Sequence, residues 1–550
     1  MGSAARVLET LVSSGIDRSR IEVLDDRTLL VEVPRNELRN VVATLRRLGA
    51  RPRTMAACDD RSRDGVYRLL YVYAFDDLGT TTILSVALDP RKPVAPTVID
   101  VDPALDWYEL EAWDLMGIEF EGRKLRRLIL PEDWPSNLHP LRKDVSIEEM
   151  KKLYKPLATW RGLEIGADSV ALIPVGPYHP ALHEPELFVL YLRGEKVVDI
   201  DYLGFMVHRG IEKLAESMTY DKVPFIAERI CGICGYAHSV AYCQAVEHAL
   251  RIEVPDRARY IRTLLLEVER IHSHLLWIGV ACHLLGFDTG FMHTWRIREK
   301  VMVLAEKLTG SRKMYGINIV GGVRMDIDSD KLSYAEKVIE ELRREVPRLI
   351  SATISVPQVR KRLSGTGILE KSDATRYAVV GPTARGSGVP IDVRKDHPYA
   401  AYGELSFRVP TYSEGDNMAR TMVRVEELEE SFSIVEQTID ALRKVGGWIA
   451  NEEYEIVPGR LGIGSVEAPR GEDIHVLITD RTTPYRWRVR APTYQNLPAL
   501  RAMLRDCDLA DAPLTIASID PCFSCTDRIL ILDLRTGGVT IRSVRKVVGG

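Results

Sequence analysis

The sequence predicts an α+β protein, in which a small N-terminal α+β domain precedes a large, mainly helical domain with β segments at both ends. Three observations support this prediction. Residues 1–145 mix strand-like and helical segments, residues from about 210 to 346 have helical periodicity, and strand-like segments return after residue 450. Because 550 residues exceed what one hydrophobic core supports, two or three domains are expected, with a boundary near residue 150.

The N-terminal domain is expected to contain two hairpins and a helix. Residues 21–33 form two strand-like runs around an Asp-Asp turn, and residues 66–75 and 80–89 form a second such pair. A short helix is expected over Trp107–Phe120, ending at Gly117. The stretch LPEDWPSNLHPLRKDV that follows is rich in proline and charge, which predicts an extended arm.

The second domain is expected to open with strands at 171–180 and 187–203. Residues 258–281 carry apolar side chains at three- and four-residue steps, which predicts a core helix with His272 on its buried face. His272 is interpreted first as a satisfied core histidine and, as an alternative, as a functional group. Strands are expected again at 473–480 and 485–492, with a terminal hairpin that turns at Gly537-Gly538.

Two cysteine pairs carry the strongest chemical signal. Cys231 and Cys234 lie in ERICGICGYAH, and Cys522 and Cys525 lie in IDPCFSCTDR. Local zinc sites place their second pair roughly 15–20 residues after the first, whereas 288 positions separate Cys234 from Cys522. Four thiolates gathered by tertiary folding predict a soft-metal redox site, with structural zinc as the main alternative. Four single cysteines are interpreted as buried hydrophobic residues: Cys58, Cys243, Cys282 and Cys507.

Composition excludes several classes of protein. A net charge of −4 argues against a nucleic-acid-binding protein. No run approaches the roughly 18 apolar residues that span a bilayer, and MGSAARVLETLVSS lacks the regions of a signal peptide. A cytoplasmic location is therefore expected, with thiols kept reduced for metal binding.

The cysteine motifs resemble those of NiFe hydrogenase large subunits, specifically the membrane-associated, energy-converting group related to respiratory complex I. Five further segments are similar to that family's core: GPYHPALHEPE, ERIHSHLLWIG, FDTGFMHTWRIRE, VGGVRMDI and RVRAPTYQNL. Residues 113–144, WDLMGIEFEGRKLRRLILPEDWPSNLHPLRKD, resemble the 30-kilodalton-type subunit of complex I. The combination resembles the large subunit of formate hydrogenlyase-type hydrogenases and covers nearly the whole chain.

The resemblance implies two domains and one cofactor. Residues 1–150 would be a complex I 30-kilodalton-subunit-like docking domain, and residues 151–550 a hydrogenase large-subunit-like catalytic domain. In the family, nickel and an iron with CO and CN ligands share four thiolates, which implies Cys231 and Cys522 as terminal ligands and Cys234 and Cys525 as bridging ligands. H2 would be formed or split heterolytically, with a terminal thiolate as the proton acceptor.

Further residues follow from the same resemblance. Glu184 is implied as a proton-relay carboxylate, because burial raises the pKa of a carboxyl towards the working range; an ordinary surface acid is the alternative, and His183 is a weaker relay candidate. Arg490 would face the cyanide ligands with a permanent charge. Four residues complete or support this arrangement: Pro492, Thr493, Arg229 and His238.

The second cysteine motif departs from the family in one place. Many hydrogenases end this motif in a histidine that helps to hold an additional divalent ion, whereas this chain has Arg528, so no such ion is predicted. The motif also resembles a processing site, and removal of the tail 529–550 is favoured over a permanent terminal hairpin.

The single cysteines provide no ligand set for an iron–sulfur cluster, so iron–sulfur clusters are expected only on partner subunits. The expected partners are a small hydrogenase subunit that carries such a cluster and other hydrophilic and membrane subunits, with H2 and protons as substrates. The protein would then lie on the inner face of the cell membrane. Formate, CO and ferredoxin routes of electron supply stay open, and the fused N-terminal domain favours the formate system.

Two other functions fit parts of the sequence. A complex I-type quinone oxidoreductase subunit shares both domains, but it does not need the four thiolates. A zinc-binding scaffold subunit would use the cysteines for structure alone. Metal analysis separates these possibilities, because it would find nickel with iron, zinc, or no metal.

Overall fold

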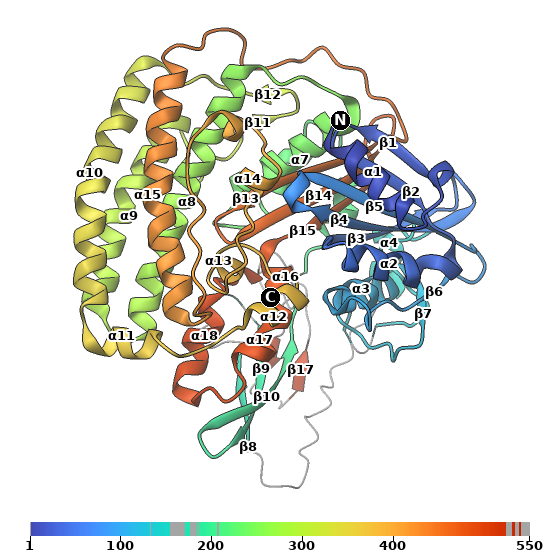
Figure 1. The fold of residues 1–550 in the computed structure, drawn as a ribbon, viewed down its shortest axis with the longest axis horizontal. Helices are drawn as coiled ribbons and strands as arrows, with labels where there is room; N and C mark the ends of the chain where they lie inside the picture. Colours follow the sequence, from blue (N-terminus) through green and yellow to red (C-terminus); the bar gives the residue numbers. More distant parts are fainter. Residues whose placement is uncertain are drawn as a thin grey trace.

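The computed structural model describes residues 2–131, 134–153, 171–176, 184, 186–205, 208–523, 531–533 and 538–540. Two parts lie side by side in Figure 1, with the N-terminal unit on the right and a group of long helices on the left. The strands β13, β14 and β15 run between them. None of the helices among the described residues combines the length and the apolar character that a membrane span requires.

A five-stranded sheet organises the N-terminal unit, in the order β1-β2-β5-β4-β3. β2 and β5 are parallel and the other neighbours are antiparallel. The strands are β1 (Ile21–Asp25), β2 (Thr28–Glu32), β3 (Arg51–Asp60), β4 (Val66–Phe75) and β5 (Thr80–Leu88). The remaining elements are α1 (Ser3–Ser13), α2 (Leu38–Arg47), α3 (Asp106–Met116), α4 (Ile147–Leu153), and the parallel pair β6 (Val94–Pro96) and β7 (Glu119–Glu121).

Both predicted N-terminal hairpins are confirmed, as β1–β2 and β4–β5. The predicted helix is also confirmed, since α3 ends at Met116 and Gly117 adopts a left-handed φ of 75°. β3 was not predicted. It contains two arginines and two aspartates, yet nine of its ten positions are buried.

Four long helices stand side by side at the left of Figure 1. They are α8 (Asp256–Leu284), α9 (Asp288–Thr309), α10 (Ser329–Ile354) and α15 (Asn417–Leu442). The predicted core helix is confirmed as α8. His272 is 1% exposed, but neither ring nitrogen has a hydrogen-bond partner among the described residues, so the described part of the chain buries this histidine without satisfying it.

Two three-stranded antiparallel sheets belong to the second part of the chain. One contains β8 (Ala171–Val175), β9 (Leu187–Arg193) and β10 (Lys196–Leu203), and the other β13 (Leu461–Ala468), β14 (Gly471–Thr479) and β15 (Pro484–Arg490). β13 packs directly on α7 (Gly235–Leu250). A Cβ at Gly464 would lie 1.9 Å from the carbonyl oxygen of Ala241, so glycine is required for this close approach.

Short elements connect these parts. They are α5 (Ile211–Ala215), α6 (Val223–Ala227), α11 (Pro357–Leu363), α12 (Lys371–Arg376), α13 (Pro382–Arg385), α14 (Val393–Asp396), α16 (Pro492–Asn496), α17 (Leu500–Met503), α18 (Ala512–Ser518), β11 (Asn318–Ile319) and β12 (Gly322–Val323). Near the C-terminus β16 (Ile531–Asp533) pairs antiparallel with β17 (Gly538–Thr540) as the predicted hairpin requires, although residues 534–537 lie outside the described part.

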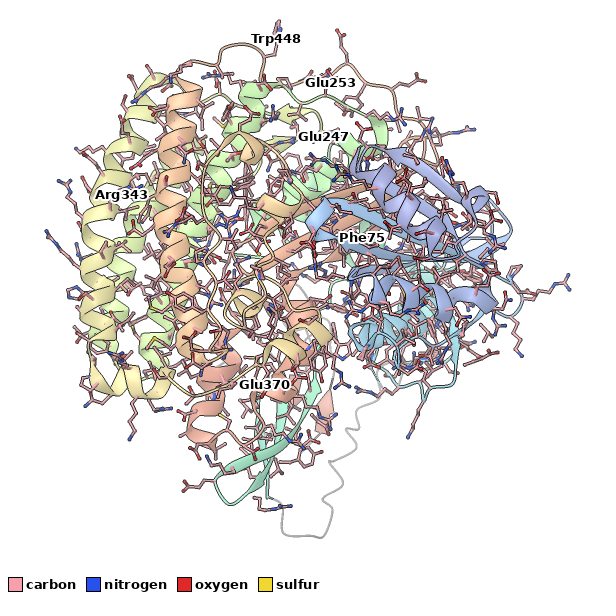
Figure 2. The ribbon with its side chains drawn as sticks, viewed as in Figure 1. Phe75, Glu247, Glu253, Arg343, Glu370 and Trp448 are labelled. Carbon is pink, nitrogen blue, oxygen red and sulfur yellow. The ribbon has the colours of Figure 1, made fainter. Side chains whose placement is uncertain are left out.

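The N-terminal sheet shares a hydrophobic core with the second part of the chain. Buried residues of β3, β4 and β5 form one cluster with Ile474, Val476 and Ile478 of β14. Side chains fill the space between the two parts, whereas Trp448, which is 84% exposed, projects at the upper edge (Figure 2). The predicted boundary near residue 150 stays a prediction, and residues 154–170 lie outside the described ranges.

Candidate metal centre

The structure brings the two cysteine motifs together. Cys231 and Cys234 lie in the loop between α6 and α7, and Cys522 follows α18. The sulfur atoms of Cys231 and Cys522 are 2.8 Å apart, across 291 sequence positions. All three side chains are at most 2% exposed and belong to one cluster of buried residues. Cys525 lies outside the described residues.

Backbone hydrogen bonds fix the orientation of these cysteines. The N–H groups of Ile233 and Cys234 each donate to the Cys231 sulfur at 3.3 Å. The Cys522 N–H donates to Oγ1 of Thr493, at 3.0 Å. Thr493 therefore holds the second cysteine motif in place from the start of α16, which is consistent with the supporting position expected for it.

The helix that follows the first motif starts against a buried carboxylate. Glu269 of α8 accepts the N–H groups of Tyr236 and Ala237 at 2.8 and 3.0 Å, in the first turn of α7. A Cβ at Gly235 would lie 2.4 Å from the Glu228 carbonyl oxygen, so only glycine fits there. Burial raises the pKa of Glu269 to about 8, although both N–H groups lower it.

Arg470 is a buried cation whose charge interacts with the sulfur atoms of the described cysteines. It lies in the turn between β13 and β14. Its Nε donates to the carbonyl oxygen of Asp520 at 2.7 Å, and its Nη2 donates to the Asp520 carboxylate at 2.9 Å. Its Nη1 donates to Oγ of Ser273 at 3.2 Å. Burial lowers the pKa of Arg470, but Asp520 and the sulfurs of the three described cysteines raise it well above its usual value. Arg470 thus supplies a fixed positive charge at the candidate centre.

Arg490 points elsewhere. Its guanidinium is fully buried and donates to the carbonyl oxygen of Arg53 at 2.8 Å and to the carboxylate and carbonyl oxygens of Glu472. These partners occupy the contact between β3, β14 and β15. The structure therefore places Arg470, and not Arg490, beside the cysteines. Arg470 was not predicted because its destination depends on Asp520, which no local pattern links to the β13–β14 turn.

The remaining predicted residues are distributed around the first motif. Arg229 is half exposed, with its guanidinium 2.8 Å from the carboxylate of Glu228 and 4.7 Å above the ring of Tyr315. Pro492 begins α16 directly before Thr493. His238 is fully buried one turn into α7.

His238 forms a compact cluster with Asp473 and His475. Its Nδ1 lies 2.8 Å from Asp473 Oδ2 and 3.3 Å from His475 Nε2. Such a group has the composition of a metal site. However, Trp487 Nε1 donates to His475 Nδ1 at 3.3 Å, so Nδ1 is the acceptor nitrogen and Nε2 carries the proton, which leaves no lone pair for a metal.

Proton sharing explains this cluster better than metal binding. Burial lowers the pKa of His238, but the Asp473 carboxylate raises it further, so that the net shift is upwards. The pKa of His475 is lowered by burial. The Asp473 carboxylate thus favours the charged form of His238, whereas burial favours the neutral form of His475.

Glu184 lies at the approach to β9 and is partly buried, while Glu186 two residues later is fully buried. The backbone at Gly176, which has a φ of 118°, packs against the Glu186 carbonyl oxygen, so the ends of β8 and β9 meet there. His183 lies outside the described residues, as does Arg528.

The four single cysteines are all buried, as predicted. Burial raises the pKa of Cys58 to about 12 and that of Cys282 to about 11, so these thiols stay protonated.

Three family models match the chain. They are described as the respiratory-chain NADH dehydrogenase 30 kDa subunit (residues 31–151), nickel-dependent hydrogenase (residues 209–288) and the respiratory-chain NADH dehydrogenase 49 kDa subunit (residues 285–528).

Similar proteins agree with these matches. Formate hydrogenlyase subunit 5 and hydrogenase-4 component G of Escherichia coli are each 43% identical over 87% of this chain and 84% of their own length. The membrane-bound hydrogenase subunit alpha of Pyrococcus furiosus is 38% identical over 66% of this chain and 88% of its own. A chain of the archaeal membrane-bound sulfane sulfur reductase superposes with a TM-score of 0.62 and 33% identity, covering 66% of this chain and 99% of that one.

Proposed function

The chain belongs to the complex I-related hydrogenase large subunits of the formate hydrogenlyase and hydrogenase-4 type, and we propose that Cys231, Cys234, Cys522 and Cys525 hold its nickel–iron centre. The protein is an oxidoreductase that acts on H2. The observation that carries the proposal is the meeting of Cys231 and Cys522 in the buried core, with Cys234 in the same cluster.

The residues present fit such a centre. Thiolates are the donors that soft, electron-rich metal centres prefer. Several buried thiolates would repel one another without positive charge, and a metal pair together with Arg470 provides that charge. When bound, the nickel–iron group supplies the binding and cleavage of H2. We propose CO and CN as the further ligands of the iron, as in the family.

The chain's own residues orient this centre and handle protons. Arg470, held by Asp520 and Ser273, provides a rigid, buried donor, and a fixed dipole acts more strongly there than it would in water. Thr493 fixes the backbone of Cys522, and Glu269 fixes the start of α7 behind Cys234. We assign to Arg470 the role that the sequence suggested for Arg490, because Arg490 is engaged with Glu472.

Proton transfer is proposed to use Cys231 or Cys522 as the first acceptor and Glu184 as the carboxyl that exchanges protons with solvent. The position of Glu184 between two strands, partly buried, suits a group that must both accept and release protons. His238, charged beside Asp473, would stabilise negative charge on the first cysteine motif.

Partner subunits complete the enzyme. Relatives of this chain are named as components of membrane-bound hydrogenase complexes, so this large subunit works with other subunits. We propose that one of them is a small subunit whose iron–sulfur cluster receives or delivers the electrons, and that membrane subunits hold the complex on the inner face of the cell membrane. A formate-oxidising partner is the favoured electron source.

Substitution of one terminal ligand tests the proposal. In Cys522→Ser, a hard and poorly ionised hydroxyl replaces a soft thiolate, so nickel content and H2 evolution should both fall to background. Cys243→Ser is the matched control, because Cys243 is a buried single cysteine on α7 outside the cluster, and it should keep both properties. Full nickel content and activity in Cys522→Ser would refute the ligand set, and zinc in place of nickel would support a scaffold.

A further inference from the structure

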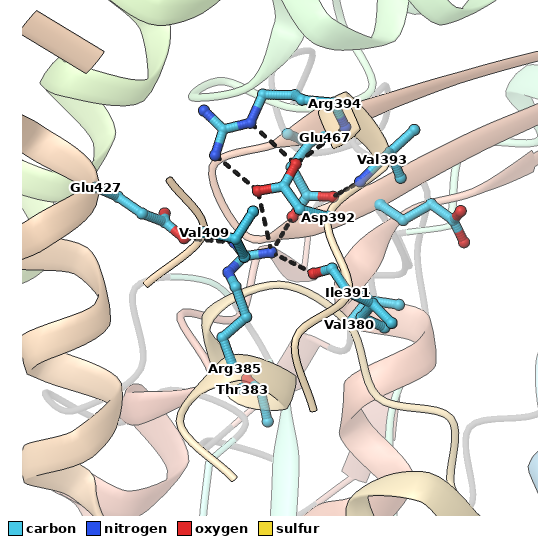
Figure 3. A network of polar contacts seen from close by, with 12 residues as sticks. Val380, Thr383, Arg385, Ile391, Asp392, Val393, Arg394, Val409, Glu427 and Glu467 are labelled. Atoms are coloured by element: carbon cyan, nitrogen blue, oxygen red, sulfur yellow. Dashed lines mark hydrogen bonds and ion pairs between the residues drawn. The ribbon is translucent and has the colours of Figure 1, made fainter. Parts of the chain in front are cut away.

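A buried ionic network includes Glu467, which lies near the end of β13 and three residues before Arg470; Figure 3 shows part of this network. It joins α8, α13, α14, α15 and β13. Every charged side chain in it is at most 2% exposed. Its members are Glu267, Arg270, His274, Arg385, Asp392, Arg394, Glu427 and Glu467.

The charges of this network do not balance. Four carboxyl groups contact three guanidinium groups, those of Arg270, Arg385 and Arg394. The next cation, Arg424, donates to the carbonyl oxygens of Arg420 and Ser518 instead of to a carboxylate. An uncompensated carboxylate in a dry interior is costly, so a proton is expected on one of the groups.

His274 does not supply the missing positive charge. Its Nε2 lies 2.7 Å from the Glu427 carboxylate, which accepts the Nε2 proton. Its Nδ1 has no partner among the described residues, and protonation would leave a buried N–H unsatisfied. Burial also lowers the pKa of His274 to about 4. The extra proton must therefore sit on a carboxyl group.

Glu267 and Asp392 are well satisfied as carboxylates, whereas Oε1 of Glu427 has an ion-pair contact but no hydrogen bond among the described residues. Glu267 accepts from Arg394 at 3.1 Å, from Tyr402 and Ser431 hydroxyls at 2.6 Å each, and lies 3.2 Å from Arg270. Asp392 accepts from two nitrogens of Arg394, at 2.7 and 3.0 Å. Glu427 lies 2.6 Å from Arg385 and 2.7 Å from His274.

Glu467 differs from Glu427 because a second carboxylate lies at the same guanidinium nitrogen: Nη1 of Arg385 is bonded to Glu467 and is also 3.5 Å from Asp392 Oδ2. It accepts from Nη1 of Arg385 at 2.8 Å and from the N–H of Val393 at 3.1 Å. Arg385 is also shared with Glu427 and lies 3.5 Å from Asp392. Glu467 thus shares the guanidinium group of Arg385 with other carboxylates and lies near the carboxylate of Asp392. Such an environment favours the neutral form of a carboxyl group.

Glu472, the residue opposite Glu467, lies in the reverse charge environment. Glu467 pairs with Glu472 across the β13–β14 ladder, and Arg470 lies in the turn between them. Glu472 contacts three guanidinium groups, those of Arg51, Arg53 and Arg490. Two buried glutamates in one hairpin therefore have opposite charge environments.

We propose that Glu467 carries an exchangeable proton at neutral pH and is a positioning residue for Arg470, releasing or taking up that proton when the charge at the cysteine site changes. The second part of this inference rests on the proposed function. Arg270 connects the two sites, because it donates to the carbonyl oxygens of Glu467 at 2.5 Å and Ala468 at 3.4 Å on the strand that leads to Arg470.

The electrostatics agree with this geometry. Burial and the Asp392 carboxylate raise the pKa of Glu467 to about 7, against the lowering effects of Arg385, Arg270 and Arg394, which are the charged groups that face it. Burial also raises the pKa of Glu472, but Arg51, Arg53 and Arg490 lower it far more, to well below its usual range.

Infrared difference spectroscopy of the metal-free protein tests the proton directly. Glu467→Gln should remove a protonated-carboxyl absorption that is present at pH 6 and lost towards pH 8, with a midpoint near 7. Glu472→Gln, the matched control in the same hairpin, should remove no such absorption. Glu269 also has a raised pKa, so the assignment uses the difference between variants and not the wild-type spectrum.

Glu467→Asp is the second variant, for use where the amide does not fold. It keeps a carboxyl, so the absorption should persist at a shifted frequency. An unchanged carboxyl region in both Glu467 variants would overturn the proposal, as would loss of the absorption in Glu472→Gln.

The coupling to the cysteine site has its own measurement. In the nickel-loaded protein, a plot of the reduction potential of the centre against pH should change slope near pH 7. Glu467→Gln should remove this change of slope while nickel content stays normal. If the change of slope persists in Glu467→Gln, the proton of Glu467 affects only the charge of the network, and the coupling to the cysteine site is refuted. Because the infrared arm uses metal-free protein, a wrong assignment of the metal centre would not affect it.

Discussion

Arg470 offers the sharpest test of the site geometry. Arg470→Lys keeps the positive charge but loses the planar fork that holds Asp520 at two atoms and Ser273 at a third. A lysine can restore one of these three hydrogen bonds. With about 1.5 kcal/mol for each lost bond to a charged group, the expected loss of stability is about 3 kcal/mol.

The effect on catalysis should be larger than that on folding. Removal of one preorganised donor from a dry active site typically lowers the rate by about 10²-fold or more. We therefore expect H2 evolution per bound nickel to fall by about 10²-fold in Arg470→Lys. The assay is H2 release from a reduced artificial donor, normalised to nickel measured in the same sample.

Arg490→Lys is the matched control. It removes a buried guanidinium of the same kind from Glu472, so its loss of stability should be similar, whereas its activity per nickel should stay within about twofold of wild type, since nothing links it to the transition state. If Arg490→Lys lost activity per nickel and Arg470→Lys did not, the assignment made from the structure would be wrong.

Three further outcomes are expected. Glu184→Gln keeps size and hydrogen bonding but cannot carry a proton, so turnover should fall about 10²-fold with normal nickel content; unchanged H2 evolution would remove it from the relay, and loss of nickel would make it structural. Deletion of residues 1–150 uncovers the apolar face of β14, so the product should aggregate and contain little nickel; a soluble, nickel-loaded product would instead support a docking module alone. The intact mass of the nickel-loaded protein should correspond to a chain that ends at Arg528, and a chain still ending at Gly550 would exclude cleavage.

Local patterns predicted much of the fold. The hairpin of residues 21–33, the stop at Gly117 and the periodicity of 258–281 each depend on residues close in sequence, and each is confirmed, although the hairpin turns at Asp26-Arg27, one residue later than predicted. β3 could not be found this way. Its arginines resemble surface charges, and only the buried Glu472, far along the chain, explains why Arg53 lies inside the protein.

The candidate site was also predicted only where local sequence or family resemblance was enough. Cysteine spacing and family resemblance are enough to predict that Cys231 and Cys522 meet. The arginine was harder, because Arg470 and Arg490 both lie next to a strand end and a proline, and their sequence surroundings do not reveal which carboxylate each one reaches. Arg470 pairs with Asp520 and Arg490 pairs with Glu472, and only the tertiary fold brings these carboxylates close to the two arginines.

The contact between β3 and β14 also has a consequence for the order of synthesis. The ribosome makes Arg53 419 positions before Glu472, and at roughly 5–20 residues per second the wait is about 20–80 s. During that time the first sheet is complete, but its apolar face and its arginines have no partner. Cys522 emerges later still, after the strands that close this face. Under the proposed ligand set, metal delivery to Cys231 and Cys234 would have a window that ends when the last part of the chain folds back, and a chaperone that covers the waiting sheet would lengthen this window.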